Sequence, residues 1–169
     1  MAAAADEARQ AGYDGTTVRS AAKRAGVAPA TAYTYFASKD HLLAEVLWRR
    51  MDAIPEVEHL PGSPLMERLA EELRAVALFM ADDPRLAAAC TTALLGSGPE
   101  VFDIRARFGA ELHRRIVLAL GPAADGGVVR SLELSWSGAM LWAGMGHMPF
   151  AAVPAALIDT ARLLLREQP

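Results

Sequence analysis

The sequence predicts an all-α fold of about nine helices, and three observations carry this prediction. No segment sustains the alternation of apolar and polar residues that marks a half-buried strand. Glycine, proline and helix-capping residues recur at spacings typical of helices and the turns between them. The last segment places its apolar residues at helical three- and four-residue intervals, namely Leu157, Ile158, Ala161, Leu164 and Leu165.

The expected helices begin and end at these residues. Gly12 and Gly15 close the first helix, and Ser38 caps the fourth. Prolines 64, 84 and 99 stand at first helical positions, where the missing N–H of proline costs no hydrogen bond. After the first helix we expect helices over residues 17–24, 29–36, 38–53, 64–81, 84–95, 99–120, 127–147 and 154–167, with a linker over 55–64.

The composition indicates a globular chain with more apolar residues than one core requires. Hydrophobic residues make up 53% of the 169 residues, so we expect a buried subunit interface, a ligand pocket, or both. The only cysteine, Cys90, excludes an intramolecular disulfide and favours a reducing, cytoplasmic setting. Residues 134–158 contain no Asp, Glu, Lys or Arg, but glycines, serines and two prolines interrupt them, which favours buried helices over a membrane span.

Charge is distributed unevenly along the chain, whose formal net charge is −3. Residues 1–50 hold seven Lys or Arg against five Asp or Glu, whereas the remainder holds ten against fifteen. Between Thr17 and Lys39 there are four basic residues and no acid. A local basic stretch on an acidic chain indicates contact with a polyanion over a confined surface.

The helices expected at 17–24 and 29–36 form a compact helix-turn-helix unit. Gly26 stands where the chain must reverse, and Val27 can fill the angle between the two helices. The second of these helices is about two turns long and has no acid, so it suits a DNA major groove about 12 Å wide. Its polar side chains are Thr31, Tyr33, Thr34 and Tyr35.

This stretch resembles the TetR family of bacterial transcriptional regulators over about residues 8–47. The matching residues are Gly12-Tyr13, Thr17-Val18-Arg19, Ala25-Gly26-Val27, Thr31, Tyr33, Tyr35-Phe36, Ser38-Lys39 and Leu42-Leu43. The resemblance implies a three-helix DNA-binding domain at 1–53 and an effector-binding and dimerisation bundle at 54–169. It also implies a homodimer that binds double-stranded DNA at a near-palindromic operator.

The resemblance and the side-chain chemistry together suggest roles at the DNA. Thr17 begins the second helix, where its hydroxyl and a backbone N–H can meet a phosphate, and Arg19 can reach a guanine edge or a phosphate. Lys39 begins the fourth helix, where its ammonium and the helix N-terminus favour the same phosphate. The contacts expected from the third helix are Pro29, Ala30, Thr31, Tyr33, Thr34 and Tyr35.

Simpler explanations exist for several of these residues. Tyr33 and Tyr35 could pack in the core at helical spacing, as we expect of Phe36, and Arg19 and Lys39 could be solvated surface charges.

Three positions also depart from the family pattern. Ala28 stands where a capping serine is common, which weakens the start of the third helix by ~1 kcal/mol. Ala8 and Ala21 replace larger apolar residues that usually brace the first helices, so we expect a less rigid DNA-binding domain.

The remaining helices carry candidates for an effector pocket and a dimer interface. A pocket needs large apolar side chains from several helices, and each candidate can equally be plain core. The candidates are Phe79, Met80, Leu94, Phe102, Phe108, Leu112, Trp136 and Met140. Because they are apolar, we expect a small, apolar effector. The candidates for the dimer interface lie in the last two helices and combine small residues, a tryptophan and a leucine stripe. They are Ser135, Gly138, Trp142, Leu157, Ala161 and Leu164.

The favoured function is a repressor that a small effector releases from its operator. The alternative is a helical architectural or adaptor DNA-binding protein without effector control. An enzyme is disfavoured, because the sequence contains no nucleophile elbow, phosphate loop or dinucleotide fingerprint. No metal or cofactor is expected, because the histidines lack ligand spacing; they are His41, His59, His113 and His147.

Overall fold

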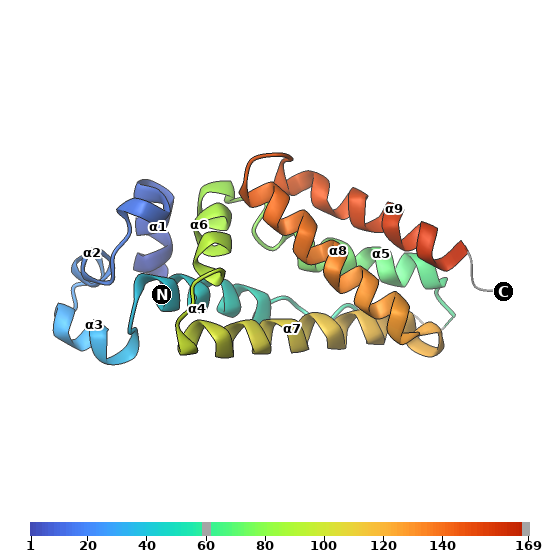
Figure 1. Cartoon of the computed structure of the whole chain (residues 1–169), viewed down its shortest axis with the longest axis horizontal. Helices are drawn as coiled ribbons and strands as arrows, with labels where there is room; N and C mark the ends of the chain where they lie inside the picture. The colour runs from blue at the N-terminus through green and yellow to red at the C-terminus, as the bar shows by residue number, and fades with distance from the viewer. Residues whose placement is uncertain (59–61, 167–169) are drawn as a thin grey trace. The chain divides into compact units, whose positions relative to one another are not determined.

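A computed structural model describes residues 1–58 and 62–166, and these residues form nine α-helices and two short 3₁₀ turns (Figure 1). The all-α prediction is therefore confirmed. The helices are α1 (Ala2–Gly15), α2 (Val18–Arg24), α3 (Pro29–Tyr35), α4 (Lys39–Asp52), α5 (Leu65–Leu78), α6 (Pro84–Leu94), α7 (Pro99–Leu120), α8 (Gly126–Gly144) and α9 (Val153–Arg166), with turns η1 (Gly121–Ala123) and η2 (Phe150–Ala152).

The predicted helix ends agree closely with the structure, apart from α5 and α8, which both stop earlier than expected. Pro84 and Pro99 begin their helices as predicted, but Pro64 is the N-cap of α5, so that helix begins one residue later than expected. The reason at α8 is its C-cap. The N–H of Gly146 donates to Ala143 O and the N–H of His147 to Trp142 O, both at 3.0 Å, and Gly146 has φ +83°. This pair of bonds closes the helix with a glycine in the left-handed region. The expected end of the last helix at 167 and His59 lie outside the described residues.

The chain divides into two compact units. Unit 1 comprises Met1–Asp52 and Asp83–Phe108, and unit 2 comprises Ala53–Asp82 and Gly109–Pro169. α6 belongs to unit 1 because it packs against α4 and α1. The first part of α7 lies in unit 1 and the rest in unit 2. A functional division at residue 53 stays a prediction.

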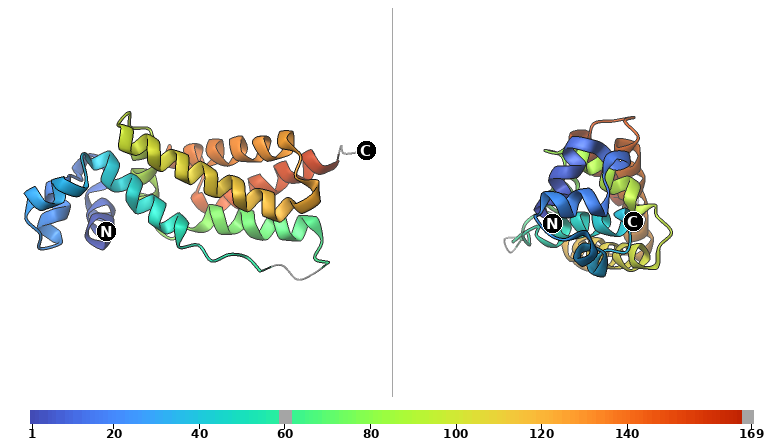
Figure 2. Two further views of the ribbon diagram at one scale, coloured as in Figure 1. Left: turned by 90° about the horizontal axis from the view of Figure 1, so that it is seen from below. Right: turned by 90° about the vertical axis from the view of Figure 1, so that its left-hand side faces the viewer.

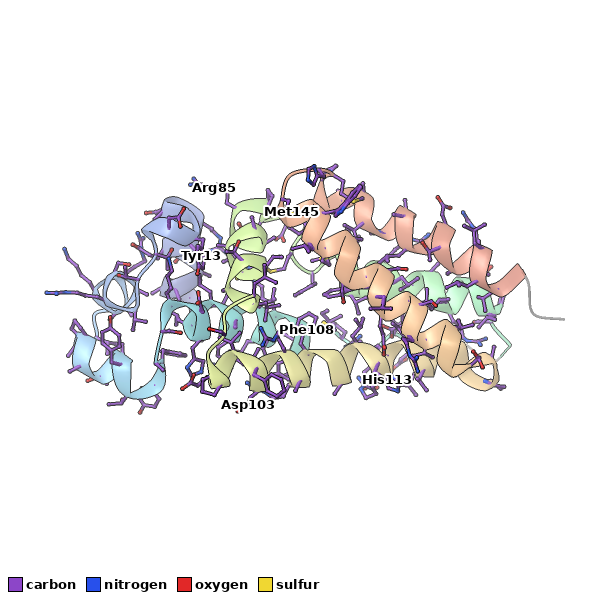
Figure 3. All side chains as sticks on the ribbon, in the orientation of Figure 1. Tyr13, Arg85, Asp103, Phe108, His113 and Met145 are labelled. Atoms are coloured by element: carbon purple, nitrogen blue, oxygen red, sulfur yellow. The ribbon has the colours of Figure 1, made fainter. Side chains whose placement is uncertain are left out.

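Asp83, the N-cap of α6, links three helices of unit 1. Its carboxylate accepts the N–H of Leu86 at 3.4 Å and forms ion pairs with Arg9 of α1 and, at 3.8 Å, with Arg50 of α4. Arg85, the second residue of α6 (Figure 3), donates to Gln10 O of α1 at 3.1 Å. Polar contacts at one end of α6 therefore fix α1 and α4 beside it.

In unit 2, α9 packs against both α8 and α5, and the α8–α9 pair can be followed in Figure 2. The buried indole N–H of Trp136 on α8 donates to Val76 O of α5 at 3.1 Å. This bond satisfies the polar end of a large buried side chain and fixes α8 on α5. No helix within residues 1–58 and 62–166 is long and apolar enough to cross a membrane.

Candidate nucleic-acid interface

Thr17 is the N-cap of α2 and fixes the start of that helix. Its hydroxyl oxygen accepts the N–H of Ser20 at 2.9 Å, while the Ser20 hydroxyl oxygen accepts the N–H of Thr17 at 3.1 Å. This reciprocal capping box leaves Thr17 exposed at a helix N-terminus. Its position suits contact with a phosphate, as the sequence suggested.

The turn between α2 and α3 has a defined hydrogen-bond pattern. The N–H of Gly26 donates to Lys23 O at 3.2 Å and that of Val27 to Ala22 O at 3.0 Å. Gly26 has φ +68°, a conformation that side-chain-bearing residues rarely adopt. The Ala25-Gly26-Val27 sequence thus ends α2 sharply and sets the direction in which α3 leaves.

α3 presents its polar side chains to solvent. None of its seven residues is buried, and the exposed fractions of Tyr33 and Tyr35 are 52% and 70%. Exposure of this size excludes core packing as the explanation for the two tyrosines. Phe36, by contrast, is half-buried and lies edge-on against the His41 ring, with centroids 5.6 Å apart.

The start of α3 has no side-chain cap, as predicted from Ala28. Pro29 occupies the first helical position instead. The adjoining α4 does have a cap, because the Ser38 hydroxyl oxygen accepts the N–H of His41 at 3.0 Å.

The basic residues of α2 differ in their partners. Arg24 donates to Glu7 and Gln10 of α1, both at 2.7 Å, so its guanidinium fastens α2 to α1. Arg19 and Lys23 are exposed, and among the described residues neither has an ion-pair or hydrogen-bond partner. Two cations with no acid beside them are available to a polyanion, and Lys23 is a candidate that the sequence interpretation did not single out.

Lys39, which we expect to contact a DNA phosphate, makes two contacts within the protein. Its ammonium donates to Tyr13 O at 3.3 Å and lies 3.8 Å from the centroid of the Tyr13 ring. The hydroxyl of Tyr13, whose side chain is labelled in Figure 3, donates to Asp40 Oδ1 at 2.6 Å. This bond, with burial, raises the pKa of the Tyr13 phenol to about 12. Lys39 therefore joins α4 to α1, and its contact with DNA stays a prediction.

An apolar cavity of about 360 Å³ lies beneath the helix-turn-helix. Its walls come from α1, α2, α3, α4 and the turn after α2; Ala21 and Ala22 of α2 and the C-cap Ala25 contribute three alanines to them. Ala21 is one of the two alanines that stand where larger residues are usual. The other, Ala8, is fully buried and is not among the residues that line this cavity.

Ala21→Leu should raise the melting temperature of the protein, because the added carbons enter the cavity and bury apolar area. We expect a gain of ~1 kcal/mol, and hence a rise of roughly 2–4 °C. Thermal unfolding followed by circular dichroism measures it. Ala8→Leu is the matched control and should instead destabilise by about 1–3 kcal/mol, since Ala8 is fully buried and does not line this cavity. A lower melting temperature for Ala21→Leu would show that the cavity cannot accept the side chain.

The candidate effector-pocket residues differ in burial. Met80, Leu112, Trp136 and Met140 are buried in unit 2, and Phe108 is buried in unit 1. Phe79 is half-buried, and Leu94 packs against the core cluster Ala44, Val101 and Ile104. Phe102 is 63% exposed on α7, so it cannot line an enclosed pocket as expected. Helical spacing does not distinguish its face of α7 from the buried one.

The candidate dimer-interface residues also differ in burial. Gly138 and Trp142 are exposed and Ser135 is half-buried; all three line an open apolar hollow of about 550 Å³ on α8 and the start of α9. Leu157 and Ala161 are 1% and 0% exposed, so they have no surface to offer a partner. The reason is that α9 turns its apolar stripe toward α5 and α8 of the same chain. Leu164 is half-buried.

Three further exposed apolar residues were not predicted: Leu134 on α8, Met145 at its C-cap and Leu163 on α9, which are 67%, 54% and 65% exposed. Leu134, Gly138, Trp142 and Met145 recur at spacings of four, four and three, so they share one face of α8. That spacing was visible in the sequence. We call this surface, made of Leu134, Gly138, Trp142, Met145 and Leu163, the α8–α9 face.

A helix-turn-helix with an exposed, acid-free second helix, followed by a larger helical bundle, defines a DNA-binding regulator of transcription. The model of the family "Bacterial regulatory proteins, tetR family" matches residues 1–46. An uncharacterised HTH-type transcriptional regulator of Mycobacterium tuberculosis is 45% identical over 167 residues, which cover 98% of this chain and 78% of the relative. The chain belongs to the TetR family of transcriptional regulators, and it is therefore a regulator and not an enzyme.

The chain has two further similarities, one in sequence and one in fold. The HTH-type transcriptional repressor KstR of Rhodococcus jostii is 37% identical over 89 residues, 52% of this chain and 42% of that protein. The crystal structure of a TetR transcriptional regulator from Rhodococcus sp. RHA1 has the same fold, with a TM-score of 0.77 and 23% identity, covering 98% of this chain and 95% of that one.

Proposed function

We propose that the protein is a repressor that binds a near-palindromic operator as a homodimer and leaves it when a small, apolar effector binds. One observation carries the DNA-binding part: α3 has no buried residue and no acid, and its hydroxyl-bearing side chains face solvent. A helix that contributes so little to the core is available for the major groove. The relatives named as repressors, though they match only half of the chain, support repression over activation.

We assign the DNA contacts by what each side chain can reach. Arg19 is the candidate for a guanine edge or a phosphate, and Thr17 for a phosphate at the start of α2. On α3, Thr31 and Thr34 supply hydroxyls and Pro29 and Ala30 supply apolar contact with thymine methyl groups. Tyr33 and Tyr35 can donate their hydroxyls to phosphates.

The dimer proposal uses the α8–α9 face. Close approach at Gly138 would let Trp142 of each chain bury its ring against the other. A two-fold dimer places two copies of α3 about 34–36 Å apart, or at a multiple of this distance, to meet successive major grooves.

The effector proposal rests on the buried apolar side chains of unit 2. Leu112 comes from α7, Trp136 and Met140 come from α8, and Met80 lies in the turn after α5; none of them is ionisable. A pocket opened among them would take an apolar molecule. Binding would lower operator affinity only if the effector prefers the conformation that does not bind DNA.

Fluorescence anisotropy with the duplex that flanks the protein's own gene tests this function, against a scrambled duplex and at two salt concentrations. We expect preference for the native duplex at both concentrations. Equal, steeply salt-dependent binding to both duplexes would contradict a site-specific repressor and favour the architectural alternative, because phosphate contacts alone carry no sequence information.

Arg19→Ala should weaken binding to the native duplex on the order of 10- to 100-fold, because each half-site loses a charge-assisted contact. The same anisotropy titration measures it, and the dependence on salt concentration should become shallower if the lost contact is to a phosphate. Arg74→Ala is the matched control, since Arg74 is exposed on α5 in unit 2. Equal losses in the two variants would argue against a specific role for Arg19.

A further inference from the structure

α7 carries a buried arginine whose function is not explained by DNA binding or by an effector pocket. The side chain of Arg115 is 3% exposed, and its guanidinium lies 3.3 Å from Glu72 of α5, which is 8% exposed. Its Nε donates to Glu111 Oε1 at 2.7 Å. Arg115 is thus held between two carboxylates inside unit 2.

Both terminal nitrogens of Arg115 also bind backbone carbonyls, and the one that donates to Pro55 O also donates to Glu72. One terminal nitrogen donates to Ile54 O at 2.5 Å and the other to Pro55 O at 3.2 Å. Arg114, the preceding residue, forms an ion pair with Glu56 at 2.9 Å. Three consecutive residues of the connection between α4 and α5 are therefore fastened to adjacent arginines of α7. We call Glu72, Glu111, Arg114 and Arg115 the Arg115 cluster.

Glu111 organises both arginines. It accepts two bonds from Arg114 and one from Arg115, all at 2.7 Å. These bonds, that to Arg114 first, hold the pKa of the Glu111 carboxyl below its ordinary value. The carboxylate thus stays charged and keeps the two guanidinium groups aimed at the connection.

The position of the fastened segment in the chain gives the cluster its significance. The chain passes between the two units at three points, after Asp52, after Asp82 and after Phe108. The first point follows the end of α4 directly, and Ile54 is only two residues further on. The third lies within α7, three residues before Glu111. The cluster therefore ties the first point to the third.

Stability alone does not account for this arrangement. A buried ion pair is seldom more stabilising than well-packed apolar residues of the same volume. What an arginine adds is geometry, because its planar guanidinium fixes the directions of several acceptors at once. Here the acceptors are two successive carbonyls at the exit of α4, the helix whose other end adjoins α3.

We propose that the Arg115 cluster couples DNA binding by unit 1 to the stability of unit 2, by holding residues 54–56 on α7. The inference rests on DNA binding by the helix-turn-helix, and the anisotropy titration measures that binding separately. Arg115 acts through the connection, so it is a positioning residue and touches neither DNA nor effector.

The test is hydrogen exchange of the full-length protein, with and without the duplex selected in the anisotropy titration, at concentrations where the free protein is fully dimeric. In the native protein the duplex should slow exchange in unit 1 and also in α5 and residues 109–120. In Glu72→Leu/Arg115→Met, which removes both buried charges and keeps apolar volume, we expect DNA affinity within about three-fold of native. Exchange at residues 54–58 should be at least about ten-fold faster, and the duplex should protect unit 1 only.

Arg162→Met is the matched control, because Arg162 pairs with Asp159 at the surface of α9, and it should behave as the native protein. Glu111→Gln is a milder second variant for the case in which the double variant does not fold, and it should reduce the DNA-induced protection of α5 in the same direction. The proposal is overturned if α5 stays protected by DNA while residues 54–58 exchange freely, or if those residues stay protected without Arg115.

Discussion

Trp142→Glu is expected to convert the proposed homodimer into a monomer and to lower operator affinity by about 100-fold or more, because one protomer then binds one half-site alone. Trp142 is 59% exposed on the α8–α9 face and lines the hollow on α8. A two-fold interface contains each residue twice, so the substitution removes two aromatic anchors and requires two carboxylates to lose water. Sedimentation velocity measures the assembly state, and anisotropy with the native duplex measures the affinity.

The control for this experiment is Leu118→Glu. Leu118 is 58% exposed on α7 and is not among the residues that line the hollow, so the same charge is introduced on an exposed apolar residue elsewhere in unit 2. This variant should remain dimeric and bind the duplex normally. A dimeric Trp142→Glu protein would show that the interface lies elsewhere.

The helices were predictable from the sequence because their ends are marked by local chemistry. Asp83 before Pro84 and Asp125 before Gly126 cap α6 and α8, and Ser38 caps α4. These signals depend on a few neighbouring residues and need no tertiary contact. The candidate DNA-contacting residues could be selected from the sequence for the same reason, since α2 and α3 are short and their pattern is local.

Burial against a particular partner was less predictable. The stripe through Leu157 and Ala161 shows that one face of α9 is buried, but the period is the same whether the partner is α5 of its own chain or a second chain. Phe102 illustrates the converse case, because a large apolar residue can lie on either face of a helix. The contact of Lys39 with Tyr13, which lies 26 residues earlier in the chain, arises from tertiary packing, so the local sequence does not predict it.

The ion pairs of Asp83 also arise from tertiary packing, and we expect them to contribute strongly to the stability of the protein. The sequence indicates its role as a cap, because it precedes Pro84 at the start of α6. Its ion pairs with Arg9 and Arg50 arise only when α1 and α4 pack beside α6. The side chain of Asp83 is 12% exposed, so its removal takes one carboxylate from each of two arginines in a partly buried site, of which Arg9 keeps its ion pair with Asp6.

Asp83→Ala should therefore destabilise the protein by about 3 kcal/mol, of which ~1 kcal/mol is the lost cap. The melting temperature, followed by circular dichroism, should fall by roughly 6–12 °C. Asp83→Asn keeps a capping oxygen and should recover part of this loss. Asp125→Ala is the matched control, because Asp125 caps α8 through the N–H groups of Gly127 and Val128, and it should cost only ~1 kcal/mol. Equal shifts for the two alanine variants would mean that the ion pairs with Arg9 and Arg50 contribute nothing beyond the cap.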